Sequence, residues 1–189
     1  MRAGAFVAGV MLCCAVACSS QTSPMGPTMT STLTVMLTDT PFADAAAVLV
    51  TFSEVSAHRS GGAFLPLTFT AGASSRTCDL KRLVGAQDVL GTGVLPAGHY
   101  TEVRLTVASA AVYLDAATTG DACGPSLAAP AGRSALVVVP SGEIKLNREF
   151  DLTAGGGTTM TLDFNGDQSL AQAGNQYILT PVITVVSVQ

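Results

Sequence analysis

The chain has 189 residues, a formal net charge of −4 at pH 7 and charged side chains at only 12% of its positions. This acidic balance excludes the basic surface by which proteins bind nucleic acid or anionic lipid. Tryptophan is absent and aromatic residues make up 5%, which argues against a sugar-binding module that stacks sugars on aromatic side chains.

The first segment in chain order is an export signal. Arg2 precedes an apolar stretch over residues 3–16, which is shorter than the roughly 20 apolar residues of a membrane-spanning helix. Small residues stand directly before Cys18, in the run Ala15-Val16-Ala17. This pattern resembles the lipobox of bacterial lipoproteins, in which Leu is usual at the first of these positions. The resemblance implies a signal peptide over residues 1–17 and a lipid on Cys18.

A polar tether follows over residues 18–30. It is rich in Ser and Thr, contains two prolines and carries no charge, which is typical of a flexible linker. Ser19 and Ser20 come directly after the cysteine, whereas Asp at that place is the common signal for retention in the inner membrane. We therefore expect an outer-membrane lipoprotein, on the periplasmic face or at the cell surface, that contacts the membrane through its N-terminal lipid.

The cysteines predict one disulfide. Cys13 and Cys14 would leave with the signal peptide and Cys18 would carry lipid, so Cys78 and Cys123 remain as a pair. Disulfides persist outside the reducing cytoplasm, and we expect a bridge between these two residues. Two buried free thiols are the simplest alternative.

Alternation of apolar and polar residues with period two dominates the next segment. It predicts strands over residues 33–38 and 48–58, the second with a bulge near Ser53 and Glu54, where the apolar positions change parity. The other elements expected in this half are a turn at Gly61-Gly62, a short strand at 64–67, a weaker strand at 77–83, and a loop or single helical turn at 84–94.

The second half begins with the turn Pro96-Ala97-Gly98, which leads into the strongest strand pattern of the chain, at residues 102–107. A second bulge is expected near residues 108–110. The run 135–139 is apolar on both faces and predicts a strand that is covered on both sides. The remaining expectations are a loop at 120–133, a strand at 144–152, a hairpin loop at Gly155-Gly156-Gly157, a strand at 160–164, a tight turn at Asn165-Gly166, and a strand at 177–188 with Pro181 at a bulge or edge.

These elements predict one all-β domain over residues 31–189. No segment beyond the export signal has a convincing helical period, and parallel strands would need crossover helices. The expected fold is a single antiparallel β-sandwich, immunoglobulin-like or transthyretin-like, with Greek-key connections.

Three segments of the chain together resemble a known family. The first reads Leu33-Thr34-Val35-Met36-Leu37-Thr38-Asp39-Thr40-Pro41 and continues over residues 48–58; the others are residues 95–105, and residues 160–164 with 177–183. The set resembles an exported prokaryotic family, the domain of unknown function 4382, which tends to have Ala at the position of Thr40. The resemblance covers about residues 31–188 and implies a β-sandwich, often on a lipoprotein, with no assigned activity.

Candidate catalytic and metal-binding sets are weak. His58 and His99 are the possible imidazole bases, each expected in a solvated position at a strand end or turn, and no Gly-x-Ser-x-Gly motif is present. A zinc site of Cys78, Cys123, His58 and His99 is an alternative to the disulfide, although zinc ligands usually come in close pairs. We expect no catalytic residue, no metal site and no cofactor.

Two acidic patterns have simple explanations. The spacing Asp163-x-Asn165-x-Asp167 imitates the start of a calcium loop but lacks its glycine and its final carboxylate, so we expect a turn whose side chains bond to nearby backbone. Asp39, placed before Thr40 and Pro41, is expected to form a turn after its strand.

The sequence therefore predicts a non-enzymatic cell-envelope lipoprotein whose β-sandwich binds an envelope protein or polymer and does not bind nucleic acid. The main alternative is a small-ligand, carbohydrate or metal-binding β-sandwich. An accessory domain that stabilises an envelope complex, and a hydrolase that uses His58 or His99 as its base, are further alternatives.

Overall fold

The computed structural model describes residues 28–40 and 44–189. The predicted signal peptide and Cys18 lie outside these residues. Thirteen strands in the described part form two sheets, joined by three short helical segments: η1 (Thr70–Gly72), η2 (Leu80–Arg82) and α1 (Gly166–Ser169). None of the helices in this part has the length and hydropathy that crossing a bilayer requires.

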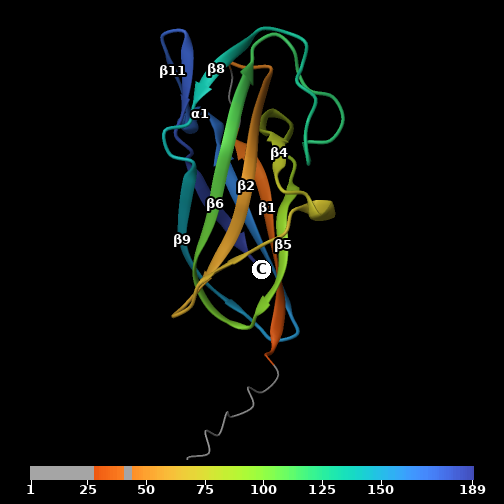
Figure 1. The fold of residues 1–189 in the computed structure, drawn as a ribbon, viewed down its shortest axis with the longest axis vertical. Coiled ribbons are helices and arrows are strands. Elements are labelled where there is room, and N and C mark those ends of the chain that lie inside the picture. The colour runs from red at the N-terminus through yellow and green to blue at the C-terminus, as the bar shows by residue number, and fades with distance from the viewer. Residues whose placement is uncertain (1–27, 41–43) are drawn as a thin grey trace, which may run out of the picture.

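The smaller sheet has four strands in the order β13–β10–β1–β5 (Figure 1). Their bounds are β13 (Ile183–Val188), β10 (Gly157–Asn165), β1 (Thr30–Thr40) and β5 (Asp88–Pro96). Along β1, the residues Leu33, Val35 and Leu37 are fully buried, while Thr34 and Met36 between them are partly exposed. This is the alternation of a strand with one face on a core.

The larger sheet has the order β11–β12–β8–β6–β2–β4–β7, with β3 beside β2 and β9 beside β6. The bounds are β2 (Ala47–Arg59), β3 (Phe64–Pro66), β4 (Arg76–Asp79), β6 (Gly98–Tyr113), β7 (Cys123–Gly124), β8 (Ser134–Val138), β9 (Glu143–Leu152), β11 (Leu170–Ala173) and β12 (Gln176–Leu179). β2 and β6 pair along nearly their whole lengths. On the far side of β6, β9 pairs with its first part and β8 with its end.

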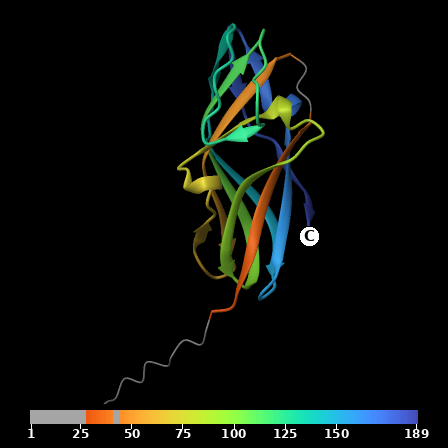
Figure 2. The same cartoon turned by 90° about the vertical axis from the view of Figure 1, so that its right-hand side faces the viewer.

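The two sheets share one hydrophobic core. Phe52 and Leu105 of the larger sheet and Leu37 and Phe164 of the smaller one are fully buried members of the same cluster. In the two orthogonal views of Figures 1 and 2, the long strands of both sheets run along the long axis of the domain. Burial of these apolar faces supplies the main driving force for the fold.

The expected all-β architecture is confirmed, but the expectation of purely antiparallel sheets is wrong. β1 pairs parallel with β10, and β12 pairs parallel with β8. A parallel pair needs a long connection, and here the connection from β1 to β10 consists of strands of both sheets instead of a crossover helix. Both sheets are therefore mixed.

Three local predictions also differ from the structure. Residues 84–94, expected as a loop or helical turn, contribute most of β5. The turn at Gly155–Gly157 connects β9 to β10 in the other sheet and does not close a hairpin. In β8, Leu136 and Val138 are 67% and 38% exposed, so this strand is covered on one face only.

The predicted strand at residues 177–188 is two strands, β12 and β13, which belong to different sheets. Pro181 lies between them, outside both ladders, so the expectation that it occupies a bulge or edge within one strand is wrong. A residue without an N–H cannot donate to a ladder, and here the strand pattern breaks at it.

Candidate functional site

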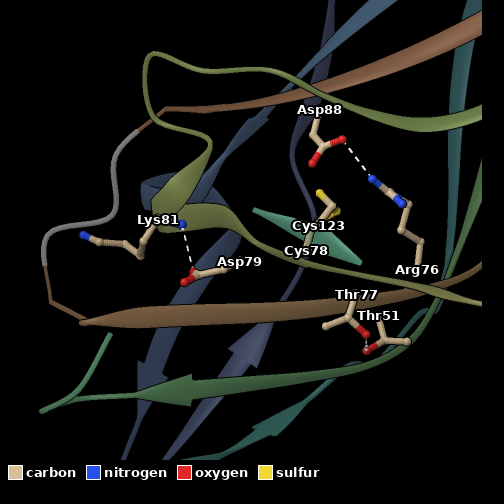
Figure 3. The surroundings of a disulfide bond; sticks show 8 residues. All are labelled: Thr51, Arg76, Thr77, Cys78, Asp79, Lys81, Asp88 and Cys123. Carbon is tan, nitrogen blue, oxygen red and sulfur yellow. Dashed lines mark hydrogen bonds and ion pairs between the residues drawn. A yellow bond between two sulfur atoms is a disulfide. The ribbon is translucent and has the colours of Figure 1, made fainter. Parts of the chain in front are cut away.

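The disulfide lies at one edge of the larger sheet, where β7 pairs with β4. Cys78 and Cys123 are directly opposite each other in the antiparallel register, with Cα atoms 4.1 Å apart and sulfur atoms 2.05 Å apart (Figure 3). Both residues are buried. The predicted bridge is confirmed, and the alternatives of free thiols and of a zinc site that uses these two sulfurs are wrong because a disulfide leaves no thiolate to bind metal.

Polar groups around the disulfide are arranged in bonded pairs (Figure 3). Asp79, which follows Cys78 and is fully buried, accepts hydrogen bonds from the backbone N–H groups of Val48 and Lys81, each at 3.1 Å, and from the hydroxyl of Thr118. A buried carboxylate with three donors is well satisfied. Asp79 thereby fixes the start of η2 against β2.

An ion pair lies on the other side of the disulfide. Nη2 of Arg76 is 2.8 Å from Oδ1 of Asp88, and the Arg76 side chain is 7% exposed. Nε of Arg76 is buried and has no hydrogen-bond partner in the described part of the chain. The pair joins β4 of the larger sheet to β5 of the smaller one, and sequence reasoning missed it because no spacing rule links the two residues.

An open groove of about 560 Å³ runs beside this ion pair. Its lining includes Arg76, Gln87, Asp88, Asp121 and Cys123. Two carboxylates and one amide can accept or donate hydrogen bonds to a hydroxylated or cationic ligand. The residues that line the groove include neither a histidine nor a free thiol, so the groove offers binding groups and no nucleophile–base pair.

The two histidines occupy separate places. His58, expected at a solvated tip, is half-buried in β2: its Nδ1 is 2.9 Å from the hydroxyl of Thr101, and its ring is 4.8 Å from that of Phe64. His99 follows a turn, as predicted, and its Nδ1 is 3.0 Å from Oδ1 of the exposed Asp151. Within the described residues, no group of three or more His, Cys, Asp or Glu side chains is placed to hold a metal ion.

A charged cluster covers the outer face of the larger sheet. The Arg104 guanidinium pairs with Glu102 at 3.1 Å and with Glu143 at 3.2 Å, and it lies 3.8 Å over the ring of Phe64. Lys145, which hydrogen-bonds to Glu143, and Arg104 hold the pKa of the Glu143 carboxyl below its usual range. The Arg104 and Glu102 side chains are partly buried, at 25% and 17% exposed, whereas Glu143 and Lys145 are exposed. Exposed pairs contribute little stability, so we interpret the outer part of the cluster as a solvated sheet face.

Asp39 differs from every other carboxyl group described above. It is 5% exposed, it points to the same side of β1 as Leu33, Val35 and Leu37, and neither of its carboxyl oxygens has a hydrogen-bond partner among the described residues. The expectation that it forms a turn is wrong, since it lies within the strand. Asp39 stands at the next alternate position after Leu33, Val35 and Leu37, and this spacing is the sequence signal that its side chain is buried.

The electrostatic surroundings of Asp39 are unfavourable for a carboxylate. Burial and the neighbouring Asp163, with a smaller effect of Asp167, raise the pKa of Asp39 to about 8, against the opposing effects of Lys81 and of the Gly166 backbone N–H. Desolvation and like charges both favour the neutral form of an acid. Asp39 is therefore mostly protonated at neutral pH.

The calcium-like spacing leads into the short helix α1, so the expected tight turn at Asn165-Gly166 is wrong, while the expected bond from Asn165 to nearby backbone is confirmed. Asn165 accepts a hydrogen bond of 3.0 Å from the backbone N–H of Gln168 and so caps α1. Asp163 accepts a hydrogen bond of 2.8 Å from the hydroxyl of Thr40 in the neighbouring strand. The side chains of Asn165 and Asp163 thus bond to neighbouring groups of the protein and stabilise the local structure.

Comparison with known proteins assigns the chain to a family. Residues 30–181 match the family model described as a domain of unknown function, DUF4382. The chain belongs to the DUF4382 family. No curated protein and no solved structure matches it. The DUF4382 match begins at the first residue of β1 and includes Asp39 and both cysteines of the disulfide, and it ends before β13.

Proposed function

We propose that this DUF4382 protein is a non-enzymatic cell-envelope lipoprotein, held at the outer membrane by a lipid on Cys18, whose β domain binds an envelope protein or polymer. The observation that carries the proposal is the lipobox-like run that ends at Cys18, shortly before a family domain that starts at residue 30. The disulfide Cys78–Cys123 supports an oxidising compartment outside the cytoplasm.

The position of the first strand supports a tethered arrangement. β1 begins at one narrow end of the domain, at the bottom of Figures 1 and 2. There, Thr30 accepts a hydrogen bond from the Gly155 N–H and Met29 accepts one from the Ala97 N–H, both at 2.8 Å. An anchor before this end would hold the turns at Ala97 and Gly155 near the membrane.

The opposite end would then face outward. It carries the β11–β12 hairpin and the connection from β6 to β8, both at the top of Figure 1. Loops on a rigid sheet scaffold are the usual binding elements of β domains. We propose that the partner contacts this end.

The anchor is tested by replacing Cys18 with alanine. Cys18→Ala should move the protein from the membrane fraction to the soluble fraction, and the mature protein should lose the mass of its acyl groups. Cys14→Ala is the matched control, because that residue lies inside the predicted signal peptide and should leave fractionation and mature mass unchanged. Membrane retention of Cys18→Ala would contradict the proposal. The partner is sought by crosslinking and affinity purification of the lipidated protein from native envelopes.

The groove beside the disulfide favours a second function, a small-ligand, carbohydrate or metal-binding module. Its lining includes Gln87, Asp88 and Asp121 around an open volume of about 560 Å³. Calorimetric titration with glycans and with calcium tests this alternative. Micromolar binding that disappears in Asp121→Asn would favour the ligand-binding function over the interaction module. The absence of binding heat with both glycans and calcium would contradict the ligand-binding function.

A further inference from the structure

The inner face of β1 ends in an acid. Leu33, Val35, Leu37 and Asp39 occupy alternate, buried positions, and Asp39 is the one whose side chain is polar. Within residues 28–40 and 44–189, neither of its oxygens has a hydrogen-bond partner. Burying an ionised carboxyl without a partner costs several kcal/mol, far more than burying the neutral acid. The structure, in which Asp39 is buried, is therefore more stable with this side chain protonated than with it ionised.

The charges that face Asp39 come from each element packed around it. β10 contributes Asp163, α1 contributes Asp167 together with the Gly166 backbone N–H, and η2 contributes Lys81. Two of the three charged neighbours are negative. The positive charge of Lys81 does not offset the effects of burial and of the two negative charges. Burial and these like charges keep the pKa of Asp39 near 8.

The same point of β1 joins three segments. The Asp39 N–H donates a hydrogen bond of 3.3 Å to the carbonyl of Leu83, just after η2. On either side of Asp39, the Thr38 hydroxyl donates to the carbonyl of Ala86 at 2.8 Å, and the Thr40 hydroxyl donates to Asp163 at 2.8 Å. We call this set of contacts between β1, residues 83–86 and the end of β10 the β1 joint.

We propose that Asp39 is a pH-sensitive pin of the β1 joint: protonated, it keeps residues 83–86 and the end of β10, with the adjoining η2 and α1, packed on β1, and its ionisation opens this joint locally. For a negative charge in this position, burial and Asp163 outweigh the favourable effects of Lys81 and of the Gly166 N–H. Separation of the segments that enclose the carboxylate is the direct way to hydrate it. The proposal is independent of the lipid anchor.

The direction of the pH effect follows from linkage. The pKa of Asp39 is about 8 in the closed joint and returns toward its ordinary value of 3.8 when the joint opens to water. The closed joint thus holds a proton that the open joint releases, so opening becomes more favourable as pH rises from about 4 to about 8. Within this window, the ratio of open to closed joint rises about tenfold per pH unit.

Hydrogen exchange measured by mass spectrometry tests the pin. Between pH 6 and pH 8, with exchange times scaled for the intrinsic rate, residues 80–86 and 163–170 should lose protection about 100-fold, while the centre of the β2–β6 pair stays protected. In Asp39→Asn, a neutral side chain of the same shape, the protection of both segments should be independent of pH. In Asp163→Asn, one like charge is removed and the pKa of Asp39 in the closed joint falls, so the loss should level off at a lower pH and be smaller in total than in the wild type.

Asp79→Asn is the matched control, because Asp79 is also fully buried but its oxygens are hydrogen-bonded. This variant should keep the pH dependence of the β1 joint even if it lowers overall stability. Carbon-13 NMR of the Asp39 carboxyl gives a readout on the unmodified protein, with an expected midpoint near pH 8. An Asp39 carboxyl that is ionised at pH 6, or protection in the wild type that does not change with pH, would overturn the proposal.

Discussion

At the scale of single residues, the start of β9 depends on a residue without a side chain. A Cβ atom on Gly142 would lie 2.7 Å from the backbone carbonyl oxygen of Val107. The two strands approach this closely because the Val107 N–H donates a hydrogen bond of 2.6 Å to the Gly142 carbonyl. Gly142 therefore sets the place where the chain leaves β8 and begins to pair with β6.

Gly142→Ala should destabilise the domain by about 1–3 kcal/mol, because the added methyl group forces the two backbones apart. Gly157→Ala is the control, since a Cβ atom there would meet no atom within 4 Å. Urea unfolding followed by circular dichroism measures both variants. Equal midpoints for the two variants would show that the close approach at Gly142 is not required.

At the scale of elements, the disulfide compensates for the shortness of β7. This strand has two residues, Cys123 and Gly124, and it lies within the long connection between β6 and β8. Its pairing with β4 consists of the cysteine pair and the neighbouring pair of Thr77 with Gly124. A strand this short has few ladder contacts, so the covalent bond holds the connection to the sheet.

Replacing both Cys78 and Cys123 with alanine should lower the free energy of unfolding by about 4 kcal/mol, because the bridge closes a loop between residues that are 45 apart in sequence. Alanine is preferred to serine since both positions are buried. Urea unfolding of the variant, compared with the wild type in the presence and absence of a reductant, measures the loss. If reduction of the wild type leaves its midpoint unchanged, the disulfide is not what stabilises this edge.

Features that depend on strand parity were predictable from the sequence. The change of apolar parity near Ser53 and Glu54 predicts a bulge in the second strand, and the β2–β6 register shifts between Phe52 and Glu54. The expected bulge in β6 is confirmed as well, because Ala108 is skipped where the same register shifts. In a strand, alternation with period two indicates the face on which each residue lies. A bulge inserts one residue and therefore interrupts this alternation.

Features that depend on the neighbouring element were not predictable. Gly91 and Gly93 break the strand pattern of β5, yet both lie against Leu67, where an added Cβ atom would be 3.4 Å away. The exposure of Leu136 in β8 likewise depends on what covers the strand. Local sequence contains neither piece of information, because both are properties of tertiary packing.

At the scale of the whole molecule, the parallel pairs determine the topology. β1 lies between β5 and β10, with Thr32 opposite Val94 in one strand and Gly157 in the other. Most of the chain must therefore be in place before the smaller sheet is complete. Such non-local pairing is typical of slowly folding β proteins, and sequence periodicity does not report which distant strands become partners.

Whole-domain stability should have its maximum on the acidic side of neutrality. The pKa of Asp39 is raised to about 8 in the folded state from an ordinary value of 3.8, so the folded state binds more protons than the unfolded state between these values. Stability should fall as pH rises through this window, by about 1.4 kcal/mol per unit for as long as the β1 joint stays closed. Asp115 and Glu143 act in the opposite direction, because hydrogen bonds from Arg133 and Lys145 lower their pKa values, and their contribution is lost only as pH falls to about 4 and below.

Thermal unfolding at intervals from pH 3 to pH 9 should therefore give the highest melting temperature near pH 4–5 and a steady decrease up to pH 8. In Asp39→Asn, the decrease should disappear, while the loss below about pH 4 that depends on Asp115 and Glu143 should remain. A decrease that levels off in the wild type well below pH 8 would mean that local opening of the β1 joint replaces global unfolding as the response to ionisation. A melting temperature that rises from pH 5 to pH 8 in the wild type would instead mean that Asp39 is ionised and satisfied in the folded domain.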